Sequence, residues 1–469
     1  MTSYLIIDLV IIARLKQYQL KQMLFVKSDQ TKSKPLPSLS ENTFLRYFTF
    51  AALYVAQGIP EGLLRFAIPA WLAMNGKGPV EIGSYVAVVN IPWSLKIINA
   101  PIMDRFTYLA MGRRRPWILF GQLGLILSFL SMSLITDPLN NLSVLMIMGF
   151  IVSFFEVSQD IAVDGMAIDI LPVDQQARAN GLMWGSKTLG ISASVAAGSW
   201  IMSHYGYFYA IVAFSLIISM IILVPLFLRE RPGEKLLPWT KGEASKAAEK
   251  IQLHSWKSIF KSLYKVFFLP VSFMMGIAAF SFSVGRGLID AVLPVFTVQQ
   301  LGWADTQYSQ IFATANLISG ISGMLIGGFL IDYFGKVKMI SIYLSLIILL
   351  VAVMSFLNSL WQDEVFVTGF IIGFYILITF TTIAIFASAM QLCWKRISAT
   401  QFTLYMAISN LGLAAGAALM GQLKGFLDWQ FVILSYIIFA GVMLVLIRFI
   451  KFEKHQVRVD ELELRYLEK

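Results

Sequence analysis

The sequence GFLIDYFGKVK (residues 328–338) is the most informative stretch for the fold, because it lies between two apolar segments and has a counterpart earlier in the chain. The counterpart is APIMDR (100–105) followed by GRRR (112–115), and its Asp104 precedes Asp332 by 228 residues. Glycine lets two helices come close, and an Asp at a helix end can pair with basic residues across the turn. The repeat predicts two similar halves in which each turn acts as a conformational latch. The latch candidates are Asp104, Arg105, Arg113, Arg114, Gly328, Asp332, Gly335 and Lys336.

The composition indicates a membrane protein. Of the 469 residues, 57% are hydrophobic and 14% are charged, whereas a soluble chain has about half apolar and about a quarter charged residues. A span of about 20 residues crosses the hydrocarbon core, so the chain has room for about a dozen spans. We predict an all-α integral membrane protein with twelve transmembrane helices in two six-helix pseudo-repeats. The expected spans are 44–73, 81–103, 115–136, 142–170, 178–203, 206–228, 266–298, 306–331, 337–357, 364–392, 400–423 and 429–451.

Basic residues mark one side of the membrane. Short loops expected on that side hold nine Lys or Arg residues, whereas the opposite loops hold only Lys77 and Lys424. Because basic loops stay in the cytoplasm, both termini are expected there, and this bias explains most of the net charge of +10. An alternative is that the two repeated turns carry only topological charges, but this explains their Lys and Arg residues and not Asp104 or Asp332.

The same arrangement predicts five segments. They are a cytoplasmic N-terminal extension (1–43), a six-helix half (44–228), a basic cytoplasmic linker (229–265), a second six-helix half (266–451) and a cytoplasmic tail (452–469). In the extension, basic residues follow a short apolar run instead of preceding it, which argues against a signal peptide. A second hypothesis is that the native chain starts at Met23 and that residues 1–22 do not belong to it.

Several function classes are disfavoured. A single cysteine, Cys393, and three histidines argue against a disulfide framework or a metal centre, so we expect no metal and no cofactor. Basic residues punctuate apolar runs and do not gather with stacking aromatics, which argues against nucleic-acid binding. The chain has no P-loop string and no nucleophile–base set of His and Cys, so we expect no enzyme.

Three acids interrupt the apolar segment 142–170. Glu156, Asp160 and Asp164 follow each other at intervals of four residues, which places them on one helix face. A carboxylate in hydrocarbon is costly and stacked acids repel each other, so at least one acid is expected to hold a proton. The pattern predicts a proton relay, with Gln159 beside it as a substrate ligand. The alternative is a structural network neutralised by one of the basic residues Lys96, Lys187 or Arg178.

Two ion pairs lie within other expected spans. Glu61 and Arg65 are four residues apart, as are Arg286 and Asp290, with the order of charges reversed. A planar guanidinium can hold a carboxylate or phosphate by two hydrogen bonds. Glycine and proline beside the pairs are expected to break or loosen the helices where they line a cavity. These four residues and Lys96 are the predicted substrate ligands; the alternative is that each Arg is neutralised by its own acid.

The two repeated turns resemble the loop signature of the major facilitator superfamily. The strings SQDIAVD (158–164), DILP (169–172), GRRRPW (112–117) and SATQF (398–402) resemble its branch of AmpG-type muropeptide permeases and acetyl-coenzyme A transporters. The resemblance covers residues 44–451 and implies a proton-driven inner-membrane importer. Its expected cargo is a bulky anionic conjugate such as an anhydromuropeptide, moved by alternating access.

Other functions remain as alternatives to this one. Within the same fold they are a siderophore transporter and an acyl-coenzyme A transporter. From other classes they are a membrane-embedded transferase and a sensor that does not transport. In every case the expected partners are a small-molecule substrate, protons and the lipid bilayer, and nothing in the sequence favours stable oligomers over a monomer.

Overall fold

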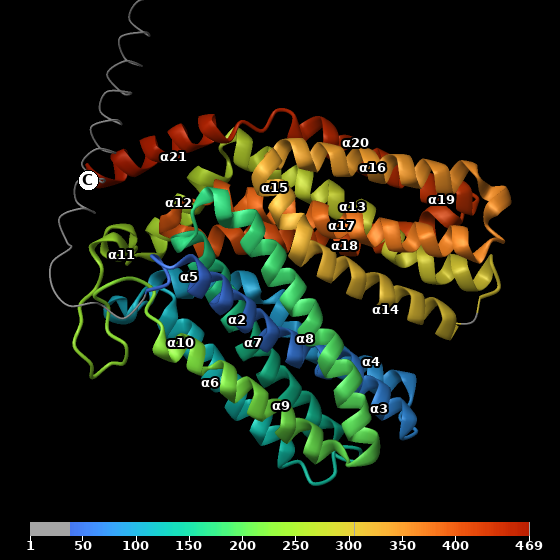
Figure 1. Cartoon of the computed structure of the whole chain (residues 1–469), viewed down its shortest axis with the longest axis horizontal. Helices are drawn as coiled ribbons and strands as arrows, with labels where there is room; N and C mark the ends of the chain where they lie inside the picture. Colours follow the sequence, from blue (N-terminus) through green and yellow to red (C-terminus); the bar gives the residue numbers. More distant parts are fainter. Residues whose placement is uncertain (1–37, 304, 469) are drawn as a thin grey trace, which may run out of the picture. The chain divides into compact units, whose positions relative to one another are not determined.

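The computed structural model describes residues 38–303 and 305–468, and the regular elements in these residues are helices (Figure 1). Apart from an isolated bridge between Ser38 and Arg229, no strand pairing occurs in the described part of the chain. The expected all-α membrane architecture is therefore confirmed. The predictions for the short apolar run near the N-terminus and for a start at Met23 concern residues outside the described ones.

The N-terminal helices run from residue 43 to residue 227. They are α2 (Thr43–Gly62), η1 (Leu63–Ala67), α3 (Ile68–Met74), α4 (Pro79–Ser94), α5 (Lys96–Arg105), α6 (Arg115–Ser133), α7 (Leu142–Ile170), α8 (Gln176–His204), α9 (Tyr207–Ile221) and α10 (Leu223–Phe227). In the expected linker, α11 (Lys246–Ile251) and α12 (Trp256–Phe267) follow, and α12 ends two residues beyond the predicted linker boundary.

The C-terminal helices begin directly after α12. They are α13 (Pro270–Gln299), α14 (Asp305–Ser322), η4 (Gly323–Gly327), α15 (Gly328–Phe334), α16 (Lys336–Phe356), α17 (Glu364–Leu392), η6 (Lys395–Ile397), α18 (Ser398–Lys424), α19 (Trp429–Leu434), α20 (Tyr436–Ile447) and α21 (Phe452–Leu467). The helix α21 occupies most of the expected tail.

Ten helices in the described residues are long and apolar enough to cross a membrane. The two expected spans outside this set are also helical, as α2–η1–α3 and as α8. Their hydropathy is lower because they carry buried polar side chains, among them Arg46, Gln57 and Lys187. The helices α2 and α8 pack closely against each other, so these polar residues face protein and not lipid.

The loops that carry most of the basic residues gather at one end of the helix bundle, which we call the basic end. Figure 1 shows α5, α11, α12 and α21 at this end, whereas α3, α14 and α19 lie toward the opposite end. The segments 106–114, 171–175, 228–267 and 393–397 belong to the basic end. This clustering agrees with a sequence in which the two repeated turns lie on the same side of the membrane.

Helix irregularities follow the expected positions only in part. A π-helical turn, Leu63–Ala67, interrupts the first span and contains Arg65, and α4 gives way to α5 at Leu95, immediately before Lys96. The expected break beside Arg286 is wrong, because α13 continues through it without interruption. The neighbouring Gly287 instead permits close packing, since a Cβ there would lie 2.1 Å from the carbonyl oxygen of Leu413 in α18.

Candidate functional site

The stacked acids of α7 meet a lysine from α5 inside the bundle. Lys96 Nζ forms an ion pair with Asp160 and lies 3.7 Å from Asp164 Oδ2. The hydroxyl of Tyr54 in α2 donates to Asp164 Oδ1 at 2.5 Å. All four side chains are buried, so the ion pair is shielded from water. Of the three basic residues considered as neutralising partners, Lys96 is the one that pairs with these acids.

A second group of charges joins α2, η1 and α8. Glu61 Oε1 accepts from Arg65 Nη1 at 2.9 Å, and its Oε2 lies 2.7 Å from Lys187 Nζ. Glu61 thus has two cationic partners, and only one was expected from the sequence. Nε and Nη2 of Arg65 are buried without a hydrogen-bond partner in the described chain. The guanidinium therefore keeps donors that a ligand could use.

The indole of Trp93 connects the two groups. Its ring centroid lies 4.9 Å from Cζ of Arg65, 5.5 Å from Nζ of Lys96 and 4.6 Å from Nζ of Lys187. Cations near an aromatic face are attracted by its quadrupole, so the indole helps to hold three positive charges in one region. Trp93 was not among the predicted site residues, although it lies only three residues before Lys96, across the change from α4 to α5.

Glu156 differs from the other acids of α7. It is fully buried, and neither of its carboxyl oxygens has a hydrogen-bond partner among the described residues. Gln159 is also fully buried, and its Nε2 donates to the carbonyl oxygen of Leu53 at 2.9 Å, which places it between α7 and α2. We call Glu61, Arg65, Lys96, Glu156, Asp160, Asp164 and Lys187 the central network; it contains four acids and three basic residues.

The Arg286–Asp290 pair in α13 forms no ion pair with the central network in the described structure. Arg286 Nε is 3.4 Å from Asp290 Oδ2, and Asp290 Oδ1 also accepts from the hydroxyl of Tyr375 in α17 at 2.8 Å. Both charged side chains of the pair keep 34% of their surface exposed, more than any member of the central network with a recorded ion pair. They can therefore meet a solute from water.

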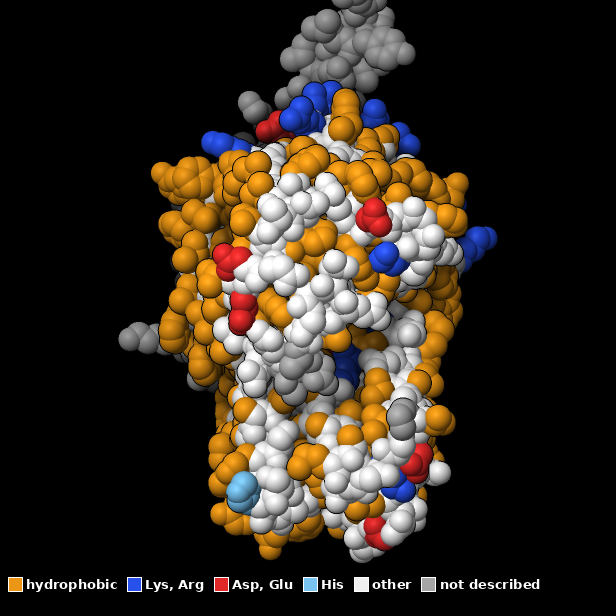
Figure 2. Space-filling view, turned by 90° about the vertical axis from the view of Figure 1, so that its right-hand side faces the viewer, with side chains coloured by type: hydrophobic (Ala, Val, Ile, Leu, Met, Phe, Trp, Pro, Cys, Tyr) orange, Lys and Arg blue, Asp and Glu red, His pale blue; other side chains and the backbone are white. Residues whose placement is uncertain are grey.

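The central network lies between N-terminal helices and the C-terminal helix α18. Lys96 Nζ lies 3.1 Å from the sulfur of Met406 in α18. A cavity of about 230 Å³ is lined by Trp93, Asn90 and Ser94 on α4 and by Ala407 and Asn410 on α18. Figure 2 shows a hollow in the face opposite the basic end, with Lys or Arg side chains inside it. A small polar solute could thus approach buried cations from this end.

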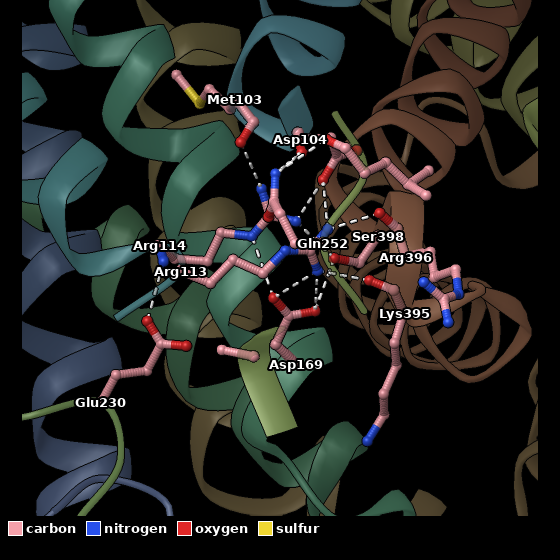
Figure 3. Close-up of polar contacts among 12 residues, drawn as sticks. Met103, Asp104, Arg113, Arg114, Asp169, Glu230, Gln252, Lys395, Arg396 and Ser398 are labelled. Atoms are coloured by element: carbon pink, nitrogen blue, oxygen red, sulfur yellow. Dashed lines mark hydrogen bonds and ion pairs between the residues drawn. The ribbon is translucent and has the colours of Figure 1, made fainter. Parts of the chain in front are cut away.

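At the basic end, two arginines join two buried aspartates (Figure 3). Arg113 lies 3.3 Å from Asp104 Oδ1 and 3.1 Å from Asp169 Oδ2. Arg114 pairs with Asp104 and, through Nε at 3.1 Å, with Asp169. None of these four side chains is more than 4% exposed. Burial lowers the pKa of Arg114, but the carboxylates of Asp104 and Asp169 outweigh it, so the pKa is raised and the charge is retained.

The same cluster reaches the helices that follow α17. Arg113 donates to the carbonyl oxygens of Lys395 at 2.5 Å and Arg396 at 2.6 Å. Ser398 Oγ donates to Asp169 Oδ1 at 2.7 Å, and Thr400 donates to Asp104 Oδ2 through N at 2.9 Å and Oγ1 at 2.6 Å. We call this set the basic-end cluster: Asp104, Arg113, Arg114, Asp169, Ser398 and Thr400.

The second repeated turn makes the reciprocal contact. Asp332 accepts from the backbone N–H groups of Ala177 at 3.1 Å and Arg178 at 2.9 Å, at the start of α8. Lys336 Nζ donates to Gln176 Oε1 at 3.0 Å. Asp104 thus caps α18 and Asp332 caps α8, so each repeated Asp holds a helix start from the other part of the chain.

The remaining latch candidates have other surroundings. A Cβ on Gly328 would lie 2.5 Å from the carbonyl oxygen of Ala177, so this glycine allows α15 to touch α8. Gly335 has a φ of +92°, which a turn between α15 and α16 requires and which favours glycine. Arg105 does not join the basic-end cluster: its Nε donates to the carbonyl oxygen of His254 at 3.1 Å, and it stacks on Trp256.

Two carboxyl groups of the linker lie beside the cluster. Glu230 Oε2 accepts from the backbone N–H of Arg114 at 2.9 Å, and Glu234 Oε2 accepts from that of Arg231, also at 2.9 Å. Burial and the neighbouring Glu230 raise the pKa of Glu234 from its ordinary value of 4.5 to about 8. Arg115, which the sequence placed among topological charges, is buried and donates to carbonyl oxygens of the linker and of α10.

The sequence is similar to that of known membrane transporters. The family model described as Major Facilitator Superfamily matches residues 50–394. The anhydromuropeptide permease of Escherichia coli (strain K12) is 24% identical over 369 residues, which cover 76% of this chain and 70% of the permease.

Two solved structures share the fold. A bacterial homologue of the iron transporter ferroportin, in its outward-facing state, is 14% identical with a TM-score of 0.63, and the match covers 87% of this chain and 99% of that one. The transporter FucP in its outward conformation is 13% identical with a TM-score of 0.62, and the match covers 87% and 98% of the two chains. Within the described residues, no group of three or more His, Cys, Asp or Glu side chains is arranged to hold a metal ion.

Proposed function

Because this chain belongs to the Major Facilitator Superfamily and is a multi-pass membrane transporter of small molecules, we propose that it imports a bulky anionic conjugate together with protons. The proposed cargo is an anhydromuropeptide, as the name of the Escherichia coli relative suggests. The proposed location is the inner membrane, with both termini in the cytoplasm. The observation that carries the proposal is the excess of acids over basic residues in the central network.

The proton site follows from counting charges. Four acids face three basic residues, so the network is neutral when one carboxyl group is protonated. Glu156 is the group that holds this resting proton, because a buried carboxylate without a hydrogen-bond donor is strongly disfavoured. Asp160 and Asp164 are the groups that exchange the transported proton, because both lie beside the single cation Lys96.

Substrate binding is linked to this proton. When Asp160 is ionised, its ion pair occupies Lys96. A proton on Asp160 frees the ammonium for an anionic group of the substrate, which can also use the two unpaired donors of Arg65. On the opposite wall we assign the exposed Arg286 to a second carboxylate or phosphate. One proton and one anionic group of the substrate together leave the central network neutral, and this is the state that can rock between the two sides.

The basic end is proposed to be cytoplasmic, because its loops follow the positive-inside rule. The basic-end cluster and the cap of Asp332 on α8 then close the cytoplasmic side and act as the two latches. The hollow opposite the basic end gives the substrate its entrance (Figure 2). Opening toward the cytoplasm requires the capped starts of α8 and α18 to leave their aspartates.

The test is uptake into proteoliposomes that contain the full chain and carry an imposed pH gradient. Separate assays use a radiolabelled anhydromuropeptide, a ferric siderophore and acetyl-coenzyme A. If one proton enters with each substrate, a gradient of one pH unit raises accumulation of the anhydromuropeptide about tenfold. Asp160→Asn should abolish this accumulation and still permit substrate exchange without a gradient, because Asn resembles the protonated acid.

The matched control is Glu453→Gln, which neutralises an exposed acid on α21 and should behave like the unchanged protein. Uptake that ignores the gradient, together with full accumulation by Asp160→Asn, would contradict proton coupling. Gradient-driven uptake of only the siderophore or acetyl-coenzyme A would keep the mechanism and replace the substrate.

A further inference from the structure

The short helix α12 carries two parallel rows of side chains. Aromatic residues recur every four residues, at Trp256, Phe260, Tyr264 and Phe268 just beyond the helix end, and each of the first three is followed by a lysine. At about 100° per residue, these positions form an aromatic row and an adjacent lysine row on one helix. The lysines are Lys257, Lys261 and Lys265.

The opposite face of α12 is the one that packs on the protein. Its residues Ile259, Ser262 and Val266 are buried. Ile259 and Val266 pack in one cluster with Trp394, the residue just before η6, and with Val459 in α21. The two rows point outward: the four aromatic side chains are between 37% and 67% exposed, and the lysines are exposed as well. The described part of the chain therefore covers one face of α12 and leaves a mixed aromatic and cationic face open.

The aromatic row adjoins the ends of two apolar spans. Phe268 stacks on Phe273, with 5.6 Å between ring centroids, and Phe273 is exposed in the first turn of the apolar span α13. At the other end, Trp256 lies 6.0 Å from the ring of exposed Phe106, which follows α5. The row thus continues into exposed aromatic surface on both sides. Figure 1 shows α12 at the basic end, beside α5.

The charge of this face selects its partner. No Asp or Glu occurs between Glu249 and Asp290, and within the described residues none of the three lysines forms an ion pair. Aromatic rings favour the boundary between acyl chains and headgroups, while lysine stems extend along apolar surface and carry their ammonium groups to phosphates. We propose that the exposed face of α12 binds anionic phospholipids of the leaflet at the basic end.

The segment that carries this site contacts both the N-terminal and the C-terminal helices. Gln252, just before α12, donates to the carbonyl oxygens of Asp104 and Arg105, while the buried face of the helix packs beside η6. Arg105 adds a fourth cation, with its Cζ 4.6 Å from the ring of Trp256. Arg105 does not belong to the basic-end cluster. Its contact with Trp256 gives it a different role, which is to position the first aromatic side chain of the row. The inference depends on the membrane location and not on the proposed substrate.

The experiment measures lipid retention by the full chain in detergent, using native mass spectrometry with added phosphatidylglycerol or phosphatidylcholine. The variant combines Lys257→Gln, Lys261→Gln and Lys265→Gln. Each lysine near an anionic surface strengthens binding about fivefold, so the triple variant should lose about a hundredfold in affinity for phosphatidylglycerol. Phosphatidylcholine should bind more weakly than phosphatidylglycerol, and inorganic phosphate should not compete.

The matched control removes the same charge from the same linker. It combines Lys241→Gln, Lys246→Gln and Lys250→Gln, three exposed lysines outside α12, and should retain phosphatidylglycerol within about twofold of the unchanged chain. Equal losses in both triple variants would reduce the effect to overall charge and overturn the site. Equal binding of the two lipids by the unchanged chain would overturn it too.

A second measurement remains informative if the triple variant folds poorly. A nitroxide label on Lys261→Cys is compared with one on Lys250→Cys in nanodiscs of phosphatidylglycerol, since the native Cys393 is buried. Oxygen should relax the label at position 261 more strongly, at the depth of the phosphates, and a water-soluble nickel chelate should relax the label at position 250. A label at 261 that stays in water would show that α12 faces a soluble partner, and would overturn the proposal.

Discussion

The central network and the basic-end cluster are built from the same residue types but differ in how completely they are paired. In the basic-end cluster, every carboxylate oxygen of Asp104 and Asp169 accepts at least one hydrogen bond. In the central network, both oxygens of Glu156 and two donors of Arg65 lack partners among the described residues. In the basic-end cluster the unpaired buried atom among the described residues is Nε of Arg113. A buried cluster whose carboxylates are all paired fixes one arrangement, whereas a cluster with an unpaired carboxyl group gains free energy from a proton or a ligand. We propose that this difference separates a part that holds the conformation from a part that binds.

The largest effect on uptake is expected from breaking the Lys96–Asp160 ion pair, which the proposed proton and the proposed substrate share. Lys96→Ala leaves Asp160 buried without its cation, and an unpaired buried charge costs about 3 to 5 kcal/mol. Asp160 should therefore keep its proton, and the anionic substrate loses its ammonium group. We expect uptake in proteoliposomes to fall at least about a hundredfold, in line with that free energy.

Two further variants make this result specific. Lys77→Ala removes a lysine at the opposite end whose ion pair with Glu81 is partly exposed, so uptake should be nearly unchanged. Lys96→Ala combined with Asp160→Ala should recover thermal stability without recovering uptake. Gradient-driven uptake by Lys96→Ala alone would mean that this pair is not the shared site.

At the basic end, the same kind of change should alter conformation more than binding. Arg114→Ala removes the partner of both Asp104 and Asp169 and so weakens the closed arrangement. The native Cys393 reports on this, because it is buried and burial raises the pKa of its thiol above the usual range. Maleimide labelling of Cys393 should become at least about tenfold faster, since the loss of a buried partner costs several kcal/mol.

The control for this labelling is Arg458→Ala on α21, whose side chain is 65% exposed and pairs only across one helical turn. Its labelling rate should match that of the unchanged chain. If Arg114→Ala remained folded and Cys393 stayed equally slow, the cluster would stabilise the fold without acting as a latch.

The contrast between the two regions also shows what the sequence could predict. The i, i+4, i+8 spacing of Glu156, Asp160 and Asp164 and the repeat of Asp104 and Asp332 are local patterns. The structure places the three acids in the central network, Asp104 in the basic-end cluster and Asp332 at the start of α8. The partners Tyr54 and Lys187 could not be assigned, because they come from helices far away in sequence whose rotation is set by packing. The same reason applies to α13, where Gly287 allows contact with α18 and Gly285 allows contact with α20, and the helix continues through Arg286 without a break.

The burial of residues outside the spans could not be predicted, for a different reason. Positive charge in a short loop is explained by topology alone, so Arg113, Arg114 and Arg115 carried no sign that they are buried. Their burial depends on the linker, whose Glu230 accepts from the backbone of Arg114. Without the fold of residues 228–245, a topological arginine and a structural one have the same sequence pattern.

The smallest effect is expected at Glu234, in the linker outside the membrane spans. It tests whether a buried carboxyl group with an unpaired oxygen holds a proton in this protein. Glu234 has one buried oxygen without a hydrogen bond, as Glu156 has two. Its pKa is raised to about 8, because of burial and the nearby Glu230. Between its ordinary pKa of 4.5 and about 8, the folded chain holds a proton that the unfolded chain has released. Stability should therefore be complete at low pH and fall as pH rises through this window.

From pH 6 to pH 9 the unchanged chain should lose about 3 kcal/mol through Glu234, because about two pH units of this window lie below the folded pKa. Glu234→Gln stays neutral and should lose much less, which thermal unfolding in detergent at the two pH values can measure. Glu243→Gln, an exposed neighbour in the same linker, should lose as much as the unchanged chain. If Glu234→Gln lost stability like the unchanged chain, a buried carboxyl group with an unpaired oxygen would be ionised in this protein. The assignment of the resting proton to Glu156 would then lose its basis, and both regions would have to be treated as fully charged.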